Sequence, residues 1–115
     1  MARRGPGQRA ERRALWHYRL RGYRVLGTNV WVAGCELDLI VRRGRRLVFV
    51  EVKSKTAPGF GAPEAMVDVW KARRLRRAAE AWVGRRRDCH GLDVAFEVVA
   101  VDGEGLRRLP LGDPV

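Results

Sequence analysis

Residues 36–53 limit the fold of this chain more than any other stretch, because they have the pattern of a tight β-hairpin. Two apolar, β-prone runs, residues 36–42 and 46–53, are joined through the turn sequence Arg43-Gly44-Arg45-Arg46. Gly44, as the first of two turn residues, meets the requirement of a type II′ turn. The two runs are therefore predicted to be antiparallel strands that are joined at this turn.

The turn also sets the register of the two predicted strands. Counting back from it, Asp38 lies opposite Glu51, and Glu36 lies opposite Lys53. Because side chains alternate along a strand, these four polar residues are expected on one face of the hairpin. The other face is expected to hold the apolar residues Leu37, Leu39, Val41, Val48, Val50 and Val52.

Two facing carboxylates need a cation or a shared proton, because like charges about 5 Å apart on neighbouring strands destabilise a sheet. Mg²⁺ or Mn²⁺ suits Asp38 and Glu51, since hard divalent ions bind carboxylate oxygens and keep waters that can attack phosphate. Lys53 can orient or deprotonate the attacking water, or stabilise charge that develops on the phosphate. The structural alternative is that each carboxylate simply pairs with a nearby arginine.

The rest of the chain predicts one domain at residues 8–101, between a basic tail at 1–7 and a C-terminal tail at 102–115. Outside the hairpin, helices are predicted at residues 8–21 and from Pro63 to about Val83, and strands at 23–32 and 93–101. Gly27-Thr28-Asn29 interrupts the first of these strands, and residues 56–61 form a loop. The order α-β-β-β-α-β indicates an α/β fold with a mixed central sheet flanked by helices.

Two further polar residues lie on otherwise apolar helical stripes. Glu11 shares a stripe with Ala14 and Tyr18, so it can reach the hairpin site as a further metal or water ligand. The alternative is a glutamate favoured by the dipole near a helix N-terminus. Lys71 shares a stripe with Leu75, and either binds phosphate or extends its amine to solvent from the core edge.

The charge balance predicts a polyanionic partner. Lys and Arg total 24 against 13 for Asp and Glu, which gives a net charge of +11 and a pI near 11.3. Such an excess favours binding to nucleic acid, although an arginine-rich genome would also produce it. The basic residues predicted to contact phosphates, rather than only to solvate the surface, are Arg42, Arg43, Arg45, Arg46, Lys55 and Lys71.

The tryptophans, the cysteines and the apolar runs indicate the core, the redox state and the absence of a membrane span. The four tryptophans, Trp16, Trp31, Trp70 and Trp82, are expected in the core rather than as platforms for base stacking. Cys35 and Cys89 fit reduced thiols in a cytoplasmic protein, or one disulfide. No apolar run approaches the roughly 18 residues of a membrane span, and the basic N-terminus lacks the apolar segment of a secretory signal. No membrane association is therefore expected.

The pattern Asp38…Glu51-x-Lys53 after a helical glutamate resembles the PD-(D/E)xK nuclease superfamily. The chain is most similar to the YraN family, also called UPF0102, of endonuclease-like bacterial proteins. The similarity covers about residues 8–101, and its central segments are Glu36-Leu37-Asp38-Leu39-Ile40 and Val48-Phe49-Val50-Glu51-Val52-Lys53. The chain departs from the usual family residues at Ala10, Trp31, Cys35, Ala95 and Glu97.

This resemblance implies a restriction-endonuclease-like fold related to archaeal Holliday junction resolvases. It implies Asp38 and Glu51 as metal ligands, Lys53 as the catalytic lysine and Glu11 as an accessory acid. A homodimer is expected by analogy with the resolvases.

The leading hypothesis is a Mg²⁺- or Mn²⁺-dependent endonuclease that hydrolyses phosphodiester bonds in DNA, including branched DNA. One alternative is a catalytically silent nucleic-acid-binding module, or a partner in a DNA-processing complex. A nuclease that acts on RNA differs only in its substrate, and the sequence does not separate it from the first hypothesis.

Overall fold

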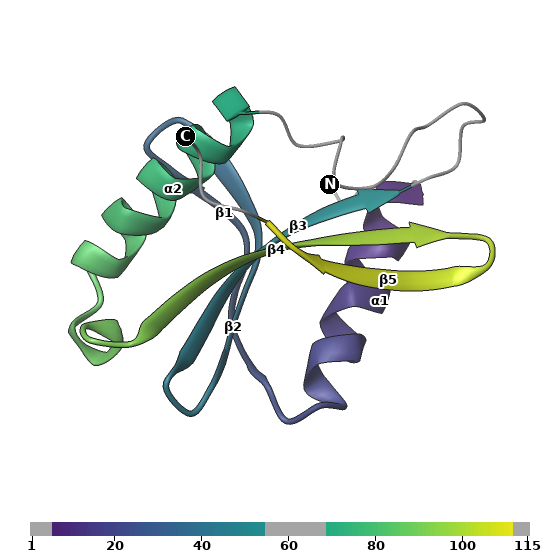
Figure 1. The fold of residues 1–115 in the computed structure, drawn as a ribbon, viewed down its shortest axis with the longest axis horizontal. Helices are drawn as coiled ribbons and strands as arrows, with labels where there is room; N and C mark the ends of the chain where they lie inside the picture. Colours follow the sequence, from purple (N-terminus) through teal and green to yellow (C-terminus); the bar gives the residue numbers. More distant parts are fainter. Residues whose placement is uncertain (1–5, 55–68, 112–115) are drawn as a thin grey trace.

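The computed structural model describes residues 6–54 and 69–111 (Figure 1). The described residues follow the order α-β-β-β-α-β-β, and a short 3₁₀ turn, η2, precedes the fourth strand. The helices are α1 (Pro6–Arg19) and α2 (Val69–Gly84), and η2 spans Arg87–Cys89. The strands are β1 (Arg24–Val32), β2 (Cys35–Arg43), β3 (Arg46–Ser54), β4 (Asp93–Asp102) and β5 (Gly105–Pro110).

The strands form one open mixed sheet in the order β1-β2-β3-β4-β5. All neighbours are antiparallel except β3 and β4, which pair in parallel over the whole length of β3. A parallel pair needs a crossover connection, and α2 lies in the segment that joins these two strands. The predicted mixed α/β architecture is confirmed.

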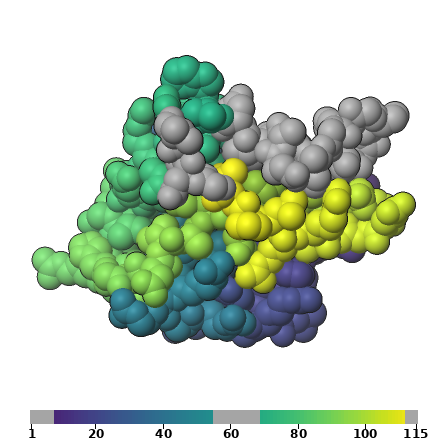
Figure 2. All heavy atoms as spheres, in the orientation of Figure 1, coloured from purple at the N-terminus to yellow at the C-terminus, as the bar shows by residue number. Residues whose placement is uncertain are grey.

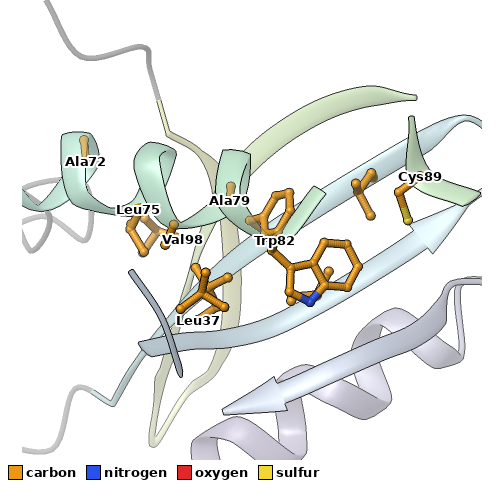
Figure 3. Packing of buried hydrophobic residues seen from close by; sticks show 12 residues of the cluster. Leu37, Ala72, Leu75, Ala79, Trp82, Cys89 and Val98 are labelled. Carbon is orange, nitrogen blue, oxygen red and sulfur yellow. The ribbon is translucent and has the colours of Figure 1, made fainter. Parts of the chain in front are cut away.

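The two helices lie on opposite sides of the sheet (Figure 1). α1 packs its small residues Ala10 and Ala14, together with Tyr18, against apolar side chains of β2, β3 and β4. α2 packs Ala72, Leu75, Ala78, Ala79 and Trp82 against the other face, and Figure 3 labels all of these except Ala78. The Phe49 ring meets the Trp82 ring edge-on in this cluster. Each face of the sheet is thus buried by one amphipathic helix.

The hairpin forms with the predicted register near its turn, since Val41 pairs with Val48 and Arg43 with Arg46. Leu39, Val41, Val48 and Val50 pack on the α1 side, as alternation predicts.

Leu37 differs, because it packs in the α2 cluster (Figure 3). Leu37 and Leu39 lie on β2, and their partners on the neighbouring strand β1 are Val30 and Thr28. Asn29, between these two partners, has a left-handed φ of 50°, so β1 is irregular at the level where Leu37 changes face.

Several predicted boundaries change. α1 begins at Pro6 and ends at Arg19, whereas residues 8–21 were expected. The C-terminal tail expected over residues 102–115 is wrong for Gly105–Pro110, which forms β5 beside β4 and lies on the surface in Figure 2. The predicted loop at residues 56–61, the helix start at Pro63 and the first five residues of the basic tail lie outside the described residues.

The expectation that tryptophan is core holds for Trp82 alone. Trp82 is 7% exposed, whereas Trp16, Trp31 and Trp70 are more than half exposed. The core on the α2 face therefore uses one indole, and the other three are available at the surface.

A buried acid, Glu97, ties α1 to the last two strands. Its carboxylate accepts hydrogen bonds from Tyr18 Oη at 2.5 Å, Arg46 at 2.8 Å and Arg108 Nε at 2.7 Å. Burial acts to raise the pKa of Glu97, but these hydrogen bonds and the Arg108 charge outweigh it, so the pKa is lowered. The arginine at position 46, expected to grip phosphate, therefore has an internal partner.

We predict that Glu97→Gln lowers the free energy of unfolding at pH 7 by about 2 kcal/mol, because a charge-assisted network is lost. A lowered folded-state pKa means that this stabilisation is present above the unfolded pKa of 4.5 and is lost as the pH falls through the folded value. Urea unfolding at several pH values measures it. The control is Asp93→Asn on the same strand, whose 78% exposed carboxylate should contribute less than about 0.5 kcal/mol.

Candidate active site

The candidate site lies where the β2–β3 ladder ends. The last pair is Leu39–Val50, so the predicted direct pairs of Asp38 with Glu51 and of Glu36 with Lys53 are not part of the ladder. Beyond this point, β3 continues beside β4, and Val52 N–H donates to Asp38 Oδ2 at 2.9 Å. The carboxylate thus replaces a strand partner at the opening between β2 and β3.

Asp38 and Glu51 are both buried and influence each other. Asp38 is 9% exposed and Glu51 is 4% exposed. Burial, reinforced by the charge of Glu51, raises the pKa of Asp38 to about 7, although the Val52 N–H acts in the opposite direction. The predicted conflict between two neighbouring carboxylates is therefore present, in a setting that favours a proton or a cation between them.

Two lysines approach Glu51 from different elements. Its Oε1 lies 3.4 Å from Lys71 Nζ on α2 and 4.0 Å from Lys53 Nζ on β3. Its Oε2 is buried and has no hydrogen-bond partner among the described residues. A buried carboxylate oxygen without a partner is costly, so this atom is a candidate ligand for a bound cation or water.

A cleft of about 450 Å³ opens over these groups and brings most of the predicted site together. Its lining comes from both helices and from the first three strands. The residues that line it are Glu11, Trp31, Gly34, Cys35, Glu36, Asp38, Glu51, Val52, Lys53, Lys71 and Arg74. Glu11, Asp38, Glu51, Lys53 and Lys71 were predicted from sequence, and all five lie here.

Glu11 is positioned by Asn29. The Asn29 Nδ2 group lies 3.3 Å from both Glu11 carboxylate oxygens. Asn29 adopts a left-handed φ of 50°, a conformation that asparagine tolerates better than most residues. This role of Asn29 was not predicted, although Gly27-Thr28-Asn29 interrupts the predicted strand at this place.

A second, smaller cleft of about 230 Å³ adjoins the first, because Glu11 and Asp38 line both. α1 contributes a stripe with spacings of three and four residues, made of Gln8, Glu11, Arg12, Leu15 and Trp16. Thr28, Asn29 and Leu39 supply the opposite wall. Asp38 therefore borders both clefts, whereas Glu51 lines only the larger one.

Four of the arginines predicted to bind nucleic acid lie at the other end of the hairpin. Gly44 lies six positions after Asp38, a rise of about 20 Å along a strand. Arg42 donates to the Asp88 carbonyl, Arg43 to the Arg21 carbonyl and Arg45 to the Gly91 carbonyl. Arg42, Arg43, Arg45 and Arg46 thus fasten neighbouring loops and strands, and the structure does not bring them to the cleft.

Of the other predicted phosphate contacts, Lys71 lines the cleft and Lys55 lies outside the described residues. Arg74 also lines the cleft, although the sequence did not distinguish it from the neighbouring arginines of the helix. The two cysteines are free, and burial raises the pKa of the Cys35 thiol in the cleft wall.

The donor set fits a hard divalent cation. Asp38 and Glu51 would provide carboxylate oxygens, including the unpartnered Oε2 of Glu51. Within residues 6–54 and 69–111, no group of three or more His, Cys, Asp and Glu side chains is placed to hold a metal. Mg²⁺ commonly uses one or two protein carboxylates and completes its shell with water and substrate phosphate, so the pair meets its needs.

The chain matches a known protein family over most of its length. The profile of the uncharacterised protein family UPF0102 matches residues 10–101. The chain belongs to this family. A UPF0102 protein of Alkalilimnicola ehrlichii is 44% identical over 85% of this chain and 78% of its own length. A UPF0102 protein of Shewanella amazonensis is 41% identical over 88% of this chain and 92% of its own length.

Among solved structures, the chain overlaps Pyrococcus furiosus SfsA in complex with Ca²⁺ with 12% identity and a TM-score of 0.39. The overlap covers 96% of this chain and 64% of that protein. This likeness is too slight to indicate a fold or a function. Neither α1 nor α2, over the described residues, has the length and apolar character to span a membrane.

We predict that wild-type stability falls relative to Asp38→Asn as the pH rises from about 4 to about 7. The pKa of Asp38 is higher in the folded than in the unfolded protein. The contribution of Asp38 to stability is therefore fully present below the unfolded pKa of 3.8 and is lost as the pH rises through the folded value of about 7. The upper limit of the change is about 4 kcal/mol.

Urea unfolding of both proteins in metal-free buffer across this range measures the difference. Glu36→Gln, on the same strand and half-buried, is the matched control. A constant difference between wild type and Asp38→Asn from pH 4 to pH 8 would contradict the prediction.

Proposed function

We propose that this protein is a Mg²⁺- or Mn²⁺-dependent endonuclease that hydrolyses phosphodiester bonds in DNA. The observation that carries the proposal is the convergence of Asp38, Glu51 and Lys53 in one cleft of a strongly basic chain. Two buried carboxylates can hold a divalent metal that activates a water, and an adjacent amine can orient that water or offset charge on the phosphate. A purely structural role does not need the open cleft on both sides of Asp38.

The metal would be held by Asp38 and Glu51, and when bound it would polarise the phosphate and lower the pKa of a water. Lys53 lies near Glu51 and is half-buried, so its amine is positioned to orient the attacking water or to offset charge on the phosphate. Glu11, held by Asn29, lines both clefts together with Asp38 and can accept a hydrogen bond from a water in either cleft.

Lys71 can act both before and after substrate binds. Its ammonium lies 3.4 Å from Glu51 Oε1 and partly neutralises that carboxylate. When substrate and metal enter, the amine can exchange this partner for a phosphate oxygen, with Arg74 beside it in the cleft wall. The side chain would thus hold the site together before binding and position the phosphate afterwards.

The alternative function is a nucleic-acid-binding module without catalysis, acting as a partner in a DNA-processing complex. The Lys71–Glu51 ion pair favours it, because a carboxylate already paired with a lysine has less need of a metal. Such a module would bind DNA with a steep salt dependence and would be little affected by loss of the Asp38 charge.

The first test is isothermal titration of Mn²⁺ into the wild-type protein. We expect binding that is lost in Asp38→Asn and in Glu51→Gln, because each substitution removes one carboxylate ligand. Glu36→Gln, in the same cleft wall, should bind Mn²⁺ as the wild type does. If Mn²⁺ fails to bind the wild type, both alone and with a DNA oligonucleotide present, the metal-dependent proposal is wrong.

The second test is cleavage of labelled duplex, single-stranded, flapped and four-way DNA, with matched RNA, in Mg²⁺ or Mn²⁺. We expect Lys53→Met to reduce the cleavage rate about 10²- to 10⁴-fold, the usual contribution of a general acid–base group. Binding of the same DNA should change much less, because Lys53 is one cation among many. Unchanged cleavage by Lys53→Met would remove the lysine from the mechanism.

A further inference from the structure

Three large aromatic side chains are exposed on a small protein. Trp16 is 51% exposed, Trp31 is 70% exposed and Trp70 is 67% exposed. An indole in water leaves much apolar surface unburied, and exposed tryptophan is typical of surfaces that bind a partner. Two of these residues, Trp16 and Trp31, line the two clefts that meet at Asp38.

Trp16 borders the smaller cleft from α1. It follows Glu11 by five residues, a rise of about 7.5 Å along the helix axis. That rise is close to the length of about two stacked nucleotides, at 3.4 Å each. Arg12 lines the same cleft, and the Arg19 guanidinium lies 5.3 Å from the Trp16 ring centre.

Trp31 borders the larger cleft from the end of β1. It pairs across the strands with Glu36, two residues before the turn at Ala33-Gly34. Both turn residues have positive φ, 51° and 74°, as a tight type I′ hairpin turn requires. The short turn holds the hairpin tip, and with it Trp31, beside a cleft whose wall also contains Arg74 and Lys71.

We propose that Trp16 and Trp31 stack unpaired bases of a DNA strand on either side of the phosphate at Asp38 and Glu51. The placement of that phosphate rests on the proposed function. Stacking on indole accepts any base, because every base has a flat π-face, while the neighbouring arginines hold the backbone. The substrate class is therefore DNA with an unpaired segment at the site, and not continuous duplex, whose bases are already stacked on one another.

Charge favours a nucleic acid over a second copy of this chain at these tryptophans. The chain carries a net charge of +11, and both indoles have arginines close to them. Two such surfaces repel each other, whereas a phosphate backbone between flat bases complements cations interleaved with rings.

Fluorescence anisotropy in EDTA tests the proposal without any catalysis. The probes are a short fluorescein-labelled oligothymidine and a duplex of the same length. We expect Trp16→Ala and Trp31→Ala each to weaken binding of oligothymidine about tenfold or more, as loss of one stacked base predicts. Duplex binding should change less than about twofold, and the salt dependence should stay the same because no charge is removed.

Matched variants separate stacking from apolar contact and from misfolding. Trp31→Phe should retain most of the affinity for oligothymidine, whereas Trp31→Leu, apolar but unable to stack, should behave like Trp31→Ala. Trp70→Ala is the control, because Trp70 is equally exposed and does not line either cleft among the described residues. Circular dichroism should give the same melting temperature for all variants, since the substituted side chains are exposed.

The outcomes that overturn the proposal are distinct. They are equal losses for single strand and duplex, an effect of Trp70→Ala as large as that of Trp31→Ala, or a wild-type dimer that Trp31→Ala dissociates. The last result would make Trp31 part of an interface between copies. Because anisotropy needs no metal, absence of Mn²⁺ binding and of cleavage would refute the proposed nuclease and leave the stacking result to be judged separately.

Discussion

The candidate site depends on the point at which β2 and β3 stop pairing. Up to Leu39 and Val50, the two strands share a regular antiparallel ladder, and beyond it β3 continues only beside β4. The backbone of β3 there would lack a partner on the β2 side, and Asp38 supplies one by accepting from the Val52 N–H. A carboxylate is thereby held at the mouth of a cleft whose walls are the separating strands.

This arrangement leaves Asp38 with few groups that stabilise its charged form, close to a second carboxylate, Glu51. Glu97, the third buried acid among the described residues, is neutralised by two arginines and a tyrosine hydroxyl, and its pKa is lowered. Asp38 receives one backbone N–H and faces Glu51, and its pKa is raised to about 7. The chain has 21 arginines, yet the cations that approach Glu51 within 4.0 Å among the described residues are lysines. Arginines thus pair with the structural acid Glu97, whereas lysines approach Glu51 in the candidate site.

Much of the site could be predicted because its parts obey local rules. A glycine turn sets the hairpin register near the turn, alternation puts the acids and Lys53 together, and helical spacing identifies Glu11 and Lys71. The arginines at the hairpin turn could not be placed in the same way. Whether they meet a phosphate or a carbonyl depends on residues about 20 to 50 positions away in the chain, such as Arg21 and Gly91. The strand β5 was missed because it is a short edge strand that contains two arginines and ends at a proline, features that a terminal tail also has.

The sequence by itself determined the mixed α/β order, the hairpin, the set of acids and amines, and the basic charge, since each follows from spacing and composition. Only the tertiary structure decided where the β2–β3 ladder ends, that Leu37 packs under α2, and that Glu11 is held by Asn29. It also decided which tryptophans are exposed, because burial of an indole depends on what packs over it from distant parts of the chain. Trp82 faces the sheet, while Trp16 and Trp31 face the two clefts.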